Sequence, residues 1–422
     1  MSRTSDVIVI GSGLAGLAAS LAAAESGKKV TIMTSGVGTM AVSSGCIDLL
    51  GYAQGKRVLF PLEEITSLPP EHPYRLVGEE AVSRSVAWLQ GVCQRYGLNL
   101  IANEDGSNHD LITVMGTLKP SYMSAQSFDT SIFDEVRRAV VITVDNMKDV
   151  HPRLIINQLH RYEQYRDMEF MEATISCPIA QAHRNITPLD IAHFVESREG
   201  EQWLIEKLTP YARLYPAILV PPVLGIQNSQ ALWERLCGIL HTRLVEMVSI
   251  PPGVAGLRVR EAMKKALNDL SCVELVENAT VSDAVTQDGR CLSVMTDNHD
   301  GERRWEADQF IIATGGILGG GLETMPGKAW ESIFKIPVDA PADPQEWASM
   351  EIFGESLFSS LGVRCNSSLQ AIDGNGQVLL QNVRFAGRIL GGYDYAAEKS
   401  GHGVALATGM QAGILASKEN AS

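Results

Sequence analysis

Six residues near the start of the chain have the types and spacing of an anion-binding turn. They form a G-x-G-x-x-G pattern made of Gly11, Ser12, Gly13, Leu14, Ala15 and Gly16. In such a turn the first glycine permits a tight bend, the second lets backbone N–H groups approach a pyrophosphate, and the third lets helix and strand pack closely. A helix that begins here would also present free N–H groups and a partial positive charge to the anion. The alternative is a glycine-rich turn in an ordinary α/β domain.

The residues on either side supply the elements that would position this turn. Residues 6–10 predict a short buried strand, the alanine-rich stretch after the turn predicts a helix that Gly27 ends, and residues 29–33 predict a second strand. The result is a complete β-α-β unit. The acidic residue that normally bonds ribose hydroxyls after the second strand is absent, and Thr34 takes its place. The phosphate prediction stands, but the adenosine end of a dinucleotide lacks its usual partner.

A second segment combines a buried strand with small residues. Residues 308–312 predict a strand that runs into Ala313, Thr314, Gly315 and Gly316. Alone, this is a common way for a buried strand to end. Together with the N-terminal unit, it resembles the second strand-end motif of two-dinucleotide-binding-domain flavoproteins, where the chain passes close to the nucleotide. The two signals favour a flavin over a nicotinamide cofactor.

A third segment lies close to the end of the chain. Residues 385–413 predict a glycine-rich turn region followed by an alanine-rich helix, and the candidate cofactor residues there are Gly391, Gly392, Gly401, His402 and Gly403. The segment resembles the C-terminal flavin segment of the fumarate reductase and succinate dehydrogenase flavoprotein class. That resemblance implies a helix N-terminus that faces the pyrimidine edge of the flavin ring and stabilises its anionic reduced form. The alternative is a C-terminal helix packed on a sheet.

Ser43, Ser44 and Gly45 lie where the same class carries a flavin-contacting segment after the second strand. A surface turn would have the same composition. The histidine that attaches flavin covalently in some members of the class is missing. The resemblance therefore implies a dissociable, non-covalent flavin.

Charge and cysteine content argue against several classes of protein. The formal net charge is −14, and no dense run of Lys or Arg is present to neutralise a nucleic-acid backbone. The seven cysteines include no C-x-x-C pair, so neither a disulfide framework nor a cysteine-ligated cluster is indicated. We expect no nucleic-acid partner and no metal.

The length of 422 residues suggests two domains. We predict an α/β fold of the two-dinucleotide-binding-domain flavoprotein type, Rossmann-like, with an inserted α+β cap or substrate domain. The expected flavin-binding domain comprises residues 1–50, 256–320 and 381–422, the cap comprises 51–255, and 321–380 form a small connecting segment.

Three helices and two turns are expected within these segments. Apolar residues at helical spacing predict helices at 82–96, 188–208 and 257–270, and the dipeptides Asp288-Gly289 and Asp300-Gly301 predict hairpin turns. Residues 7–24 are apolar or small, like a signal-peptide core or a membrane span, but they contain the glycine turn and lie between Asp6 and Glu25. We therefore predict no signal peptide and no transmembrane helix.

Short motifs spread over nearly the whole chain carry a closer resemblance. They are residues 43–50 (SSGCIDLL), 71–74 (EHPY), 116–118 (GTL), 251–258 (PPGVAGLR) and 390–394 (LGGYD). In order and spacing they resemble the B subunit of the anaerobic glycerol-3-phosphate dehydrogenases. One departure is the stretch 398–403 (EKSGHG), where a more glycine-rich sequence is expected.

The resemblance implies a flavoprotein component of a larger complex, with FMN as its cofactor. It also implies a catalytic, FAD-containing A subunit and an iron–sulfur C subunit that anchors the complex on the cytoplasmic side of the bacterial inner membrane. Such a complex oxidises sn-glycerol 3-phosphate to dihydroxyacetone phosphate and passes electrons to menaquinone, then to fumarate or nitrate. FAD stays open as the cofactor, because the turn geometry suits a pyrophosphate.

Oxidising a secondary alcohol needs a base for the hydroxyl proton and cations for the phosphate. His402, beside the expected flavin, is the candidate base, and Arg258 is a candidate anion ligand, although an arginine that starts a helix more often forms a salt bridge. His72 and Lys119 are weaker candidates. Three alternatives stay open: a component that only relays electrons, a free-standing flavoenzyme similar to fumarate reductase or ketosteroid dehydrogenase, and a scaffold without catalysis.

Overall fold

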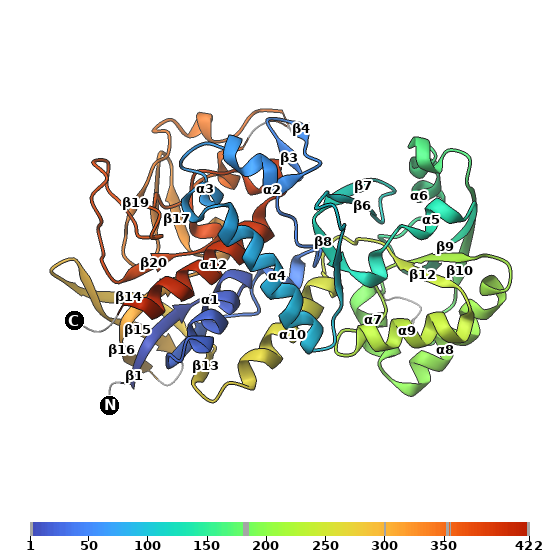
Figure 1. Ribbon diagram of the computed structural model, residues 1–422, viewed down its shortest axis with the longest axis horizontal. Coiled ribbons are helices and arrows are strands. Elements are labelled where there is room, and N and C mark those ends of the chain that lie inside the picture. Colours follow the sequence, from blue (N-terminus) through green and yellow to red (C-terminus); the bar gives the residue numbers. More distant parts are fainter. Residues whose placement is uncertain (1–2, 180–184, 299–300, 352–353, 355, 420–422) are drawn as a thin grey trace. The chain divides into compact units, whose positions relative to one another are not determined.

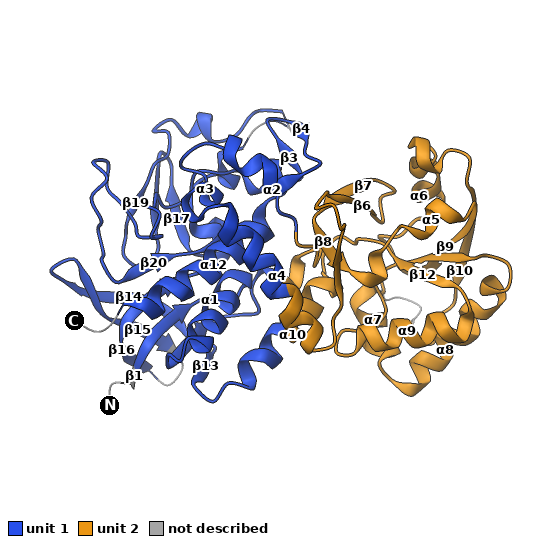
Figure 2. Ribbon diagram, viewed as in Figure 1, with its two compact units in different colours: residues 1–39, 48–89, 263–422 blue, residues 40–47, 90–262 orange. Residues whose placement is uncertain are grey.

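The computed structural model describes residues 3–179, 185–298, 301–351, 354 and 356–419 (Figure 1). The chain forms two compact units (Figure 2). Unit 1 contains residues 1–39, 48–89 and 263–422, and unit 2 contains residues 40–47 and 90–262. Helices α4 (Glu79–Arg95) and α10 (Val254–Asn268) and the 3-10 turn η1 (Thr39–Val42) contribute residues to both units.

The described residues of unit 1 build a seven-stranded sheet in the order β13-β2-β1-β16-β15-β14, with β20 paired to β16. Strands β13, β2, β1, β16 and β20 pair in parallel, and β16, β15 and β14 form an antiparallel meander. The bounds are β1 Arg3–Ile10, β2 Val30–Thr34, β13 Val273–Glu277, β14 Thr280–Gln287, β15 Arg290–Asn298, β16 Gly301–Ile312 and β20 Val383–Phe385. Residues 7–10 of β1 are buried and apolar without alternation, as expected for a parallel strand covered on both faces.

Two helices of unit 1 pack side by side against this sheet, α1 (Leu14–Glu25) and α12 (Gly401–Lys418) (Figure 1). They run parallel, because Gly409 lies against the backbone of Ala15 and Gly413 lies against that of Ala19. A side-chain carbon at Gly409 would collide with the carbonyl oxygen of Ala15. Small residues at this contact let the two helix backbones approach closely.

Gly409→Ala is therefore expected to lower the free energy of unfolding by about 1–3 kcal/mol, because the added methyl group forces the helices apart. Urea unfolding measures this change. Gly91→Ala is the matched control, since Gly91 is exposed in α4 and an added carbon would meet no described atom within 4 Å. The control should be stabilised, by up to about 1 kcal/mol. Equal stability changes in the two variants would contradict the close packing.

The remaining elements of unit 1 are short and surround these layers. They are β3 Tyr52–Ala53, β4 Lys56–Arg57, α2 Pro61–Glu64, η2 Ile65–Ser67, α3 Pro73–Val77, η5 Ile317–Gly319, β17 Leu322–Met325, β18 Lys328–Glu331, β19 Pro337–Val338, η6 Pro344–Trp347, η7 Leu357–Ser359, η8 Gly387–Ile389 and α11 Tyr395–Glu398. Strands β17, β18 and β19 form an antiparallel sheet of their own.

The described part of unit 2 centres on a four-stranded parallel sheet in the order β10-β9-β11-β12. Its strands are β9 Arg138–Val144, β10 Glu169–Ile175, β11 Ala217–Val220 and β12 Arg243–Glu246, and its helices are α5 Ile132–Glu135, α6 Pro152–Leu159, α7 Pro188–Val195, α8 Arg198–Ala212 and α9 Ser229–Leu240. Short antiparallel pairs join β5 (Leu100–Ala102) to β8 (Met123–Ala125) and β6 (His109–Ile112) to β7 (Leu118–Ser121). Two 3-10 turns, η3 Gln126–Phe128 and η4 Glu163–Tyr165, complete the unit.

The local predictions are confirmed for most elements. The β1-α1-β2 unit, α4, α10, the strand ending at Ile312 and the turn at Asp288-Gly289 all form. The helix predicted at 188–208 is instead two helices, because Ser197 caps the start of α8 through the N–H of Gly200. Asp300 lies outside the described residues.

The domain boundaries differ from those predicted. Residues 51–89 belong to unit 1, where the N–H of Gly51 donates to the carbonyl of Glu398 at 2.8 Å. Residues 40–47 belong to unit 2, because they pack on the start of α10. Residues 321–380 are part of unit 1 rather than a separate connection, and Val363 pairs with Leu390 there.

None of the helices within the described ranges combines the length and apolar character needed to cross a bilayer.

Candidate flavin site

The predicted anion-binding turn lies at the carboxyl end of β1, between β1 and α1. Gly11 adopts a φ of +109°, and a side chain there would collide with the carbonyl oxygen of Ala313. A side-chain carbon at Gly16 would likewise collide with the carbonyl oxygen of Gly11. A carbon added at Gly13 would meet no described atom within 4 Å. The first and third glycines are therefore needed for packing, and the second leaves open space over the start of α1.

The start of α1 presents unused hydrogen-bonding capacity. Its N-cap is Gly13, and no side chain of the described residues caps the first turn, formed by Leu14, Ala15 and Gly16. The hydroxyl of Thr314 is buried and has no hydrogen-bond partner among the described residues. Because β16 pairs with β1, the backbone N of Thr314 lies next to Gly11. Helix N–H groups without a capping side chain fit a phosphate.

Gly315 and Gly316 follow Thr314 and turn the chain away from β16. A Cβ placed on Gly315 would lie 3.4 Å from Gly319, and one placed on Gly316 would lie 3.3 Å from the side chain of Arg388. The structure thus brings the N-terminal turn and residues 314–316 together at one edge of the sheet, as predicted.

The adenosine end of a dinucleotide would lie at the end of β2, where the side chains bond to one another. The hydroxyl of Ser12 donates to Oγ1 of Thr34 at 2.8 Å, and Thr34 donates to the carbonyl of Gly36 at 2.6 Å. A carbon on Gly38 would lie 3.3 Å from the backbone N of Gly13. The loop after β2 therefore lies close to the turn. It accepts a hydrogen bond from the hydroxyl of Thr34, the residue that replaces the usual acid.

The N-terminus of α12 lies further out along the same direction. Gly409 is level with Ala15 in α1, and α12 begins eight residues earlier at Gly401, so it extends about 12 Å beyond that level. A ribityl chain leading from a phosphate at α1 would run towards this second helix N-terminus. That the two helix starts hold the two ends of one flavin stays a prediction.

His402 lies in the first turn of α12 with its side chain 22% exposed, and its Nδ1 is 4.0 Å from a carboxylate oxygen of the buried Asp48. The backbone of Asp48 holds the same turn, since its carbonyl accepts from the N–H of Gly403 at 3.0 Å. A side chain at Gly403 would collide with the hydroxyl of Tyr74, and Gly401 lies against Tyr395. No pattern in the sequence points to Asp48 as a neighbour of His402.

A buried network explains why residues 398–403 depart from a glycine-rich sequence. One carboxylate oxygen of Glu398 accepts from Nε2 of His72 at 3.1 Å and from Ser400 at 2.7 Å, and the other accepts from the N–H of Asp394 at 3.1 Å. The N–H of Tyr74 donates to Nδ1 of His72, so the proton of a neutral His72 resides on Nε2. His72 is completely buried and therefore positions Glu398 and the start of α12.

Gly391 and Gly392 are in tight contact with the protein itself. A side chain at Gly392 would lie 2.5 Å from the carbonyl oxygen of Glu71, and one at Gly391 would lie 2.7 Å from that of Gly362. Both glycines thus allow close backbone packing, and their contact with a flavin stays a prediction.

Ser43, Ser44 and Gly45 belong to unit 2. The hydroxyl of Ser43 accepts from the N–H of Gly45 at 3.0 Å, and Gly253 and Gly256 pack directly on Ser43. This loop is therefore bound to the start of α10, and its contact with a flavin also stays a prediction.

Arg258 lies in α10 and is 2% exposed. Its guanidinium forms two bonds to the carboxylate of Glu246, at 2.5 Å and 2.8 Å, and Nε donates to the carbonyl of Gly225 at 2.8 Å. Glu246 also accepts from Ser127 and from the N–H of Leu224. These contacts agree with the salt-bridge interpretation of Arg258 and leave its donors engaged inside unit 2.

Arg258→Lys retains the charge but loses the paired geometry and the bond to Gly225. We expect the free energy of unfolding to fall by about 2 kcal/mol, with flavin content unchanged. Chemical denaturation and the flavin absorbance of the purified variant measure the two quantities. A variant of unaltered stability that no longer binds a phosphorylated substrate would instead support the anion-ligand role.

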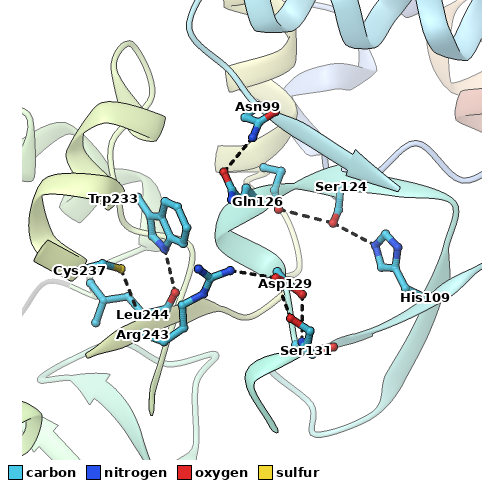
Figure 3. Close-up of polar contacts among 12 residues, drawn as sticks. Asn99, His109, Ser124, Gln126, Asp129, Ser131, Trp233, Cys237, Arg243 and Leu244 are labelled. Atoms are coloured by element: carbon cyan, nitrogen blue, oxygen red, sulfur yellow. Dashed lines mark hydrogen bonds and ion pairs between the residues drawn. The ribbon is translucent and has the colours of Figure 1, made fainter. Parts of the chain in front are cut away.

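A second polar cluster in unit 2 surrounds His109 and Ser124 (Figure 3). His109 Nε2 is 3.1 Å from the hydroxyl of Ser124, which is completely buried. Nearby, Arg243 bonds Asp129 at 2.8 Å and stacks on the ring of Trp233 (Figure 3). Ser124 is completely buried, whereas His109 is partly exposed. Lys119 lies on β7 in the same unit.

Comparisons with known proteins identify the family of the chain. A family model described as "FAD binding domain" matches residues 6–404. The B subunit of the anaerobic glycerol-3-phosphate dehydrogenase of Aliivibrio fischeri (strain ATCC 700601 / ES114) is 30% identical over 430 residues, covering 96% of this chain and 94% of the relative. The probable B subunit of the same enzyme of Halobacterium salinarum (strain ATCC 29341 / DSM 671 / R1) is 29% identical over 433 residues, covering 99% of both chains.

Among solved structures, 3-ketosteroid delta1-dehydrogenase from Sterolibacterium denitrificans aligns over 99% of both chains, with 10% identity and a TM-score of 0.45. The match to the family model and the relatives matched over nearly their full length decide the assignment: the chain belongs to the FAD binding domain family and, within it, to the B subunits of the anaerobic glycerol-3-phosphate dehydrogenases.

Proposed function

We propose that the chain is the flavin-binding B subunit of a respiratory dehydrogenase that oxidises sn-glycerol 3-phosphate to dihydroxyacetone phosphate. Two features support this proposal: similarity to B subunits over almost the whole chain, and the N-termini of two parallel, adjacent helices of unit 1, of which α12 starts further out than α1. The observation that carries the flavin part is the open, uncapped start of α1, next to the backbone of Thr314.

The flavin of this proposal is FMN, bound without a covalent link. Phosphate binding is assigned to the turn 11–16 and Thr314, and the ring is assigned to the start of α12. The hydroxyls of Ser12 and Thr34 already bond within the chain, which removes the usual ribose partner of an adenine dinucleotide and favours the mononucleotide. When bound, the flavin would accept a hydride from the substrate carbon that carries the hydroxyl group.

His402 is the proposed base for that hydroxyl. It lies in the first turn of α12 with its side chain partly exposed, where an imidazole nitrogen can reach a substrate hydroxyl. The carboxylate of Asp48, 4.0 Å from Nδ1, then stabilises the proton once His402 holds it.

The partners of this proposal are a catalytic, FAD-containing A subunit and an iron–sulfur C subunit that anchors the complex at the cytoplasmic side of the inner membrane. Electrons pass to menaquinone and then to fumarate or nitrate. The names of the curated relatives as B subunits support membership in an assembly.

Anaerobic addition of glycerol 3-phosphate to the flavin-loaded chain tests the substrate assignment. Loss of the oxidised-flavin absorbance is expected, and glycerol without phosphate is the control. Bleaching by neither compound, even with the partner proteins present, would refute the assignment.

A second candidate function is electron relay by a chain that has no substrate site of its own. The burial of Arg258 against Glu246 favours it, because the cation predicted to bind a phosphate is occupied. In that case the flavin stays oxidised with the isolated chain and bleaches only when the A subunit is added.

A further inference from the structure

Tyr393 is a buried tyrosine at the expected ring end of the flavin site. It follows Gly392, is 3% exposed, and has its ring 5.7 Å from that of His72 in an edge-on arrangement. The guanidinium carbon of Arg388 lies 6.0 Å from the centre of the Tyr393 ring. Because Gly391 and Gly392 pack tightly on neighbouring backbone, the position of this ring is fixed.

The hydroxyl of Tyr393 is buried without a hydrogen-bond partner among the described residues. Such a donor destabilises a folded chain unless an acceptor is supplied, and an unpaired buried group in a native structure calls for a specific explanation, such as a functional role. Neighbouring polar groups already have partners. Tyr74 donates to the carbonyl of Leu49 at 2.7 Å, and both carboxylate oxygens of Glu398 accept hydrogen bonds from His72, Ser400 and Asp394.

Burial raises the pKa of the Tyr393 hydroxyl well above its usual range, and the charge of Glu398 raises that pKa further, against the opposing effect of Arg388. The group therefore stays protonated and acts as a donor. Its natural partner is a carbonyl oxygen or a ring nitrogen with a free lone pair.

The place of Tyr393 links this donor to the start of α12. The ring of His72 contacts both Tyr393 and Tyr74, and the hydroxyl of Tyr74 lies against Gly403 in the first turn of the helix. We propose that the hydroxyl of Tyr393 donates a hydrogen bond to an acceptor on the pyrimidine part of the bound flavin. This inference rests on the proposed function, and adds to it a residue that holds the ring.

Tyr393→Phe tests the inference, because it removes only the hydroxyl. Titration of the apo chain with FMN should give about tenfold weaker binding, the loss of one hydrogen bond. Thermal unfolding of the apo variant should show an unchanged or higher Tm, since an unpaired buried donor has been removed. The carbonyl stretching bands of bound FMN should move to higher wavenumber.

Tyr165→Phe is the matched control. Tyr165 is also 3% exposed but lies in unit 2, and its hydroxyl bonds Thr130 and Gln164. Its replacement should lower the Tm and leave FMN affinity unchanged, the opposite of the Tyr393 result. If Tyr393→Phe lowers the Tm and binds FMN like the wild type, the hydroxyl bonds within the protein and the inference is wrong. A wild-type chain that binds no flavin would refute the proposed function itself.

Discussion

Gly13→Asp is expected to weaken flavin binding strongly while the chain stays folded. The substitution places a carboxylate over the start of α1, where the phosphate of the flavin is proposed to bind, and like charges this close repel by several kcal/mol. We expect affinity to fall by about 10³-fold. Flavin titration of the apo variant, followed by absorbance and fluorescence, measures the change.

The structure makes this a clean test of the site. No described atom lies within 4 Å of the added carbon, and Gly13 has an extended backbone that aspartate adopts readily. Aspartate is also a better N-cap than glycine, so the apo variant should gain a few tenths of a kcal/mol in stability. Gly374→Asp, at another open position in unit 1, is the charge-matched control and should bind flavin normally. Full flavin content in the Gly13→Asp variant would show that the phosphate does not bind at this turn.

His402→Gln is expected to slow substrate reduction of the flavin by about 10² to 10⁴-fold, the usual contribution of a general base. The reason is its place in the first turn of α12, where it is partly exposed and 4.0 Å from Asp48. Flavin content should stay at the wild-type level. Rapid anaerobic mixing with glycerol 3-phosphate gives the rate, in the isolated chain or, if reduction needs them, with the partner proteins.

His193→Gln is the control for that experiment, since His193 is an exposed residue of α7 in unit 2. It should leave the rate unchanged. A His402→Gln chain that reduces at the wild-type rate would show that another group takes the proton.

The phosphate end of the site is predictable from the sequence because its signal is local. Gly11, Gly13 and Gly16 lie within one turn, and their different roles follow from the geometry of a strand that leads into a helix. Pairing of β16 with β1 then brings Thr314 beside that turn. The missing acid at Thr34 is also visible in the sequence, although the bonds of Thr34 to Ser12 and Gly36 require the structure.

The ring end depends on contacts between residues far apart in the chain. His72 meets Glu398 across 326 positions, and a sequence pattern cannot pair a histidine with a carboxylate at that distance. The sequence leaves Arg258 open as an anion ligand, because its partner Glu246 lies on a strand whose neighbours are set by parallel pairing. The unpaired hydroxyl of Tyr393 is likewise a property of packing.

The compact units differ from the predicted division into domains for a related reason. Residues 40–47 follow β2, which places them in the predicted flavin domain, but small residues let them pack on Gly253 and Gly256 instead. Residues 51–89 begin the irregular middle of the chain, which places them in the predicted cap, but Tyr74 packs at the start of α12. In both cases the unit that a segment joins is decided by its close packing contacts and not by its neighbours along the sequence.

Purification of the chain alone, followed by acid release of its flavin and identification by chromatography and mass, tests the flavin site most directly. FMN is expected in a stoichiometric amount, released without proteolysis. FAD would contradict the mononucleotide assignment drawn from Ser12 and Thr34. A chain that contains no flavin, and takes up neither FMN nor FAD when they are added, would contradict the central claim that this fold holds a flavin.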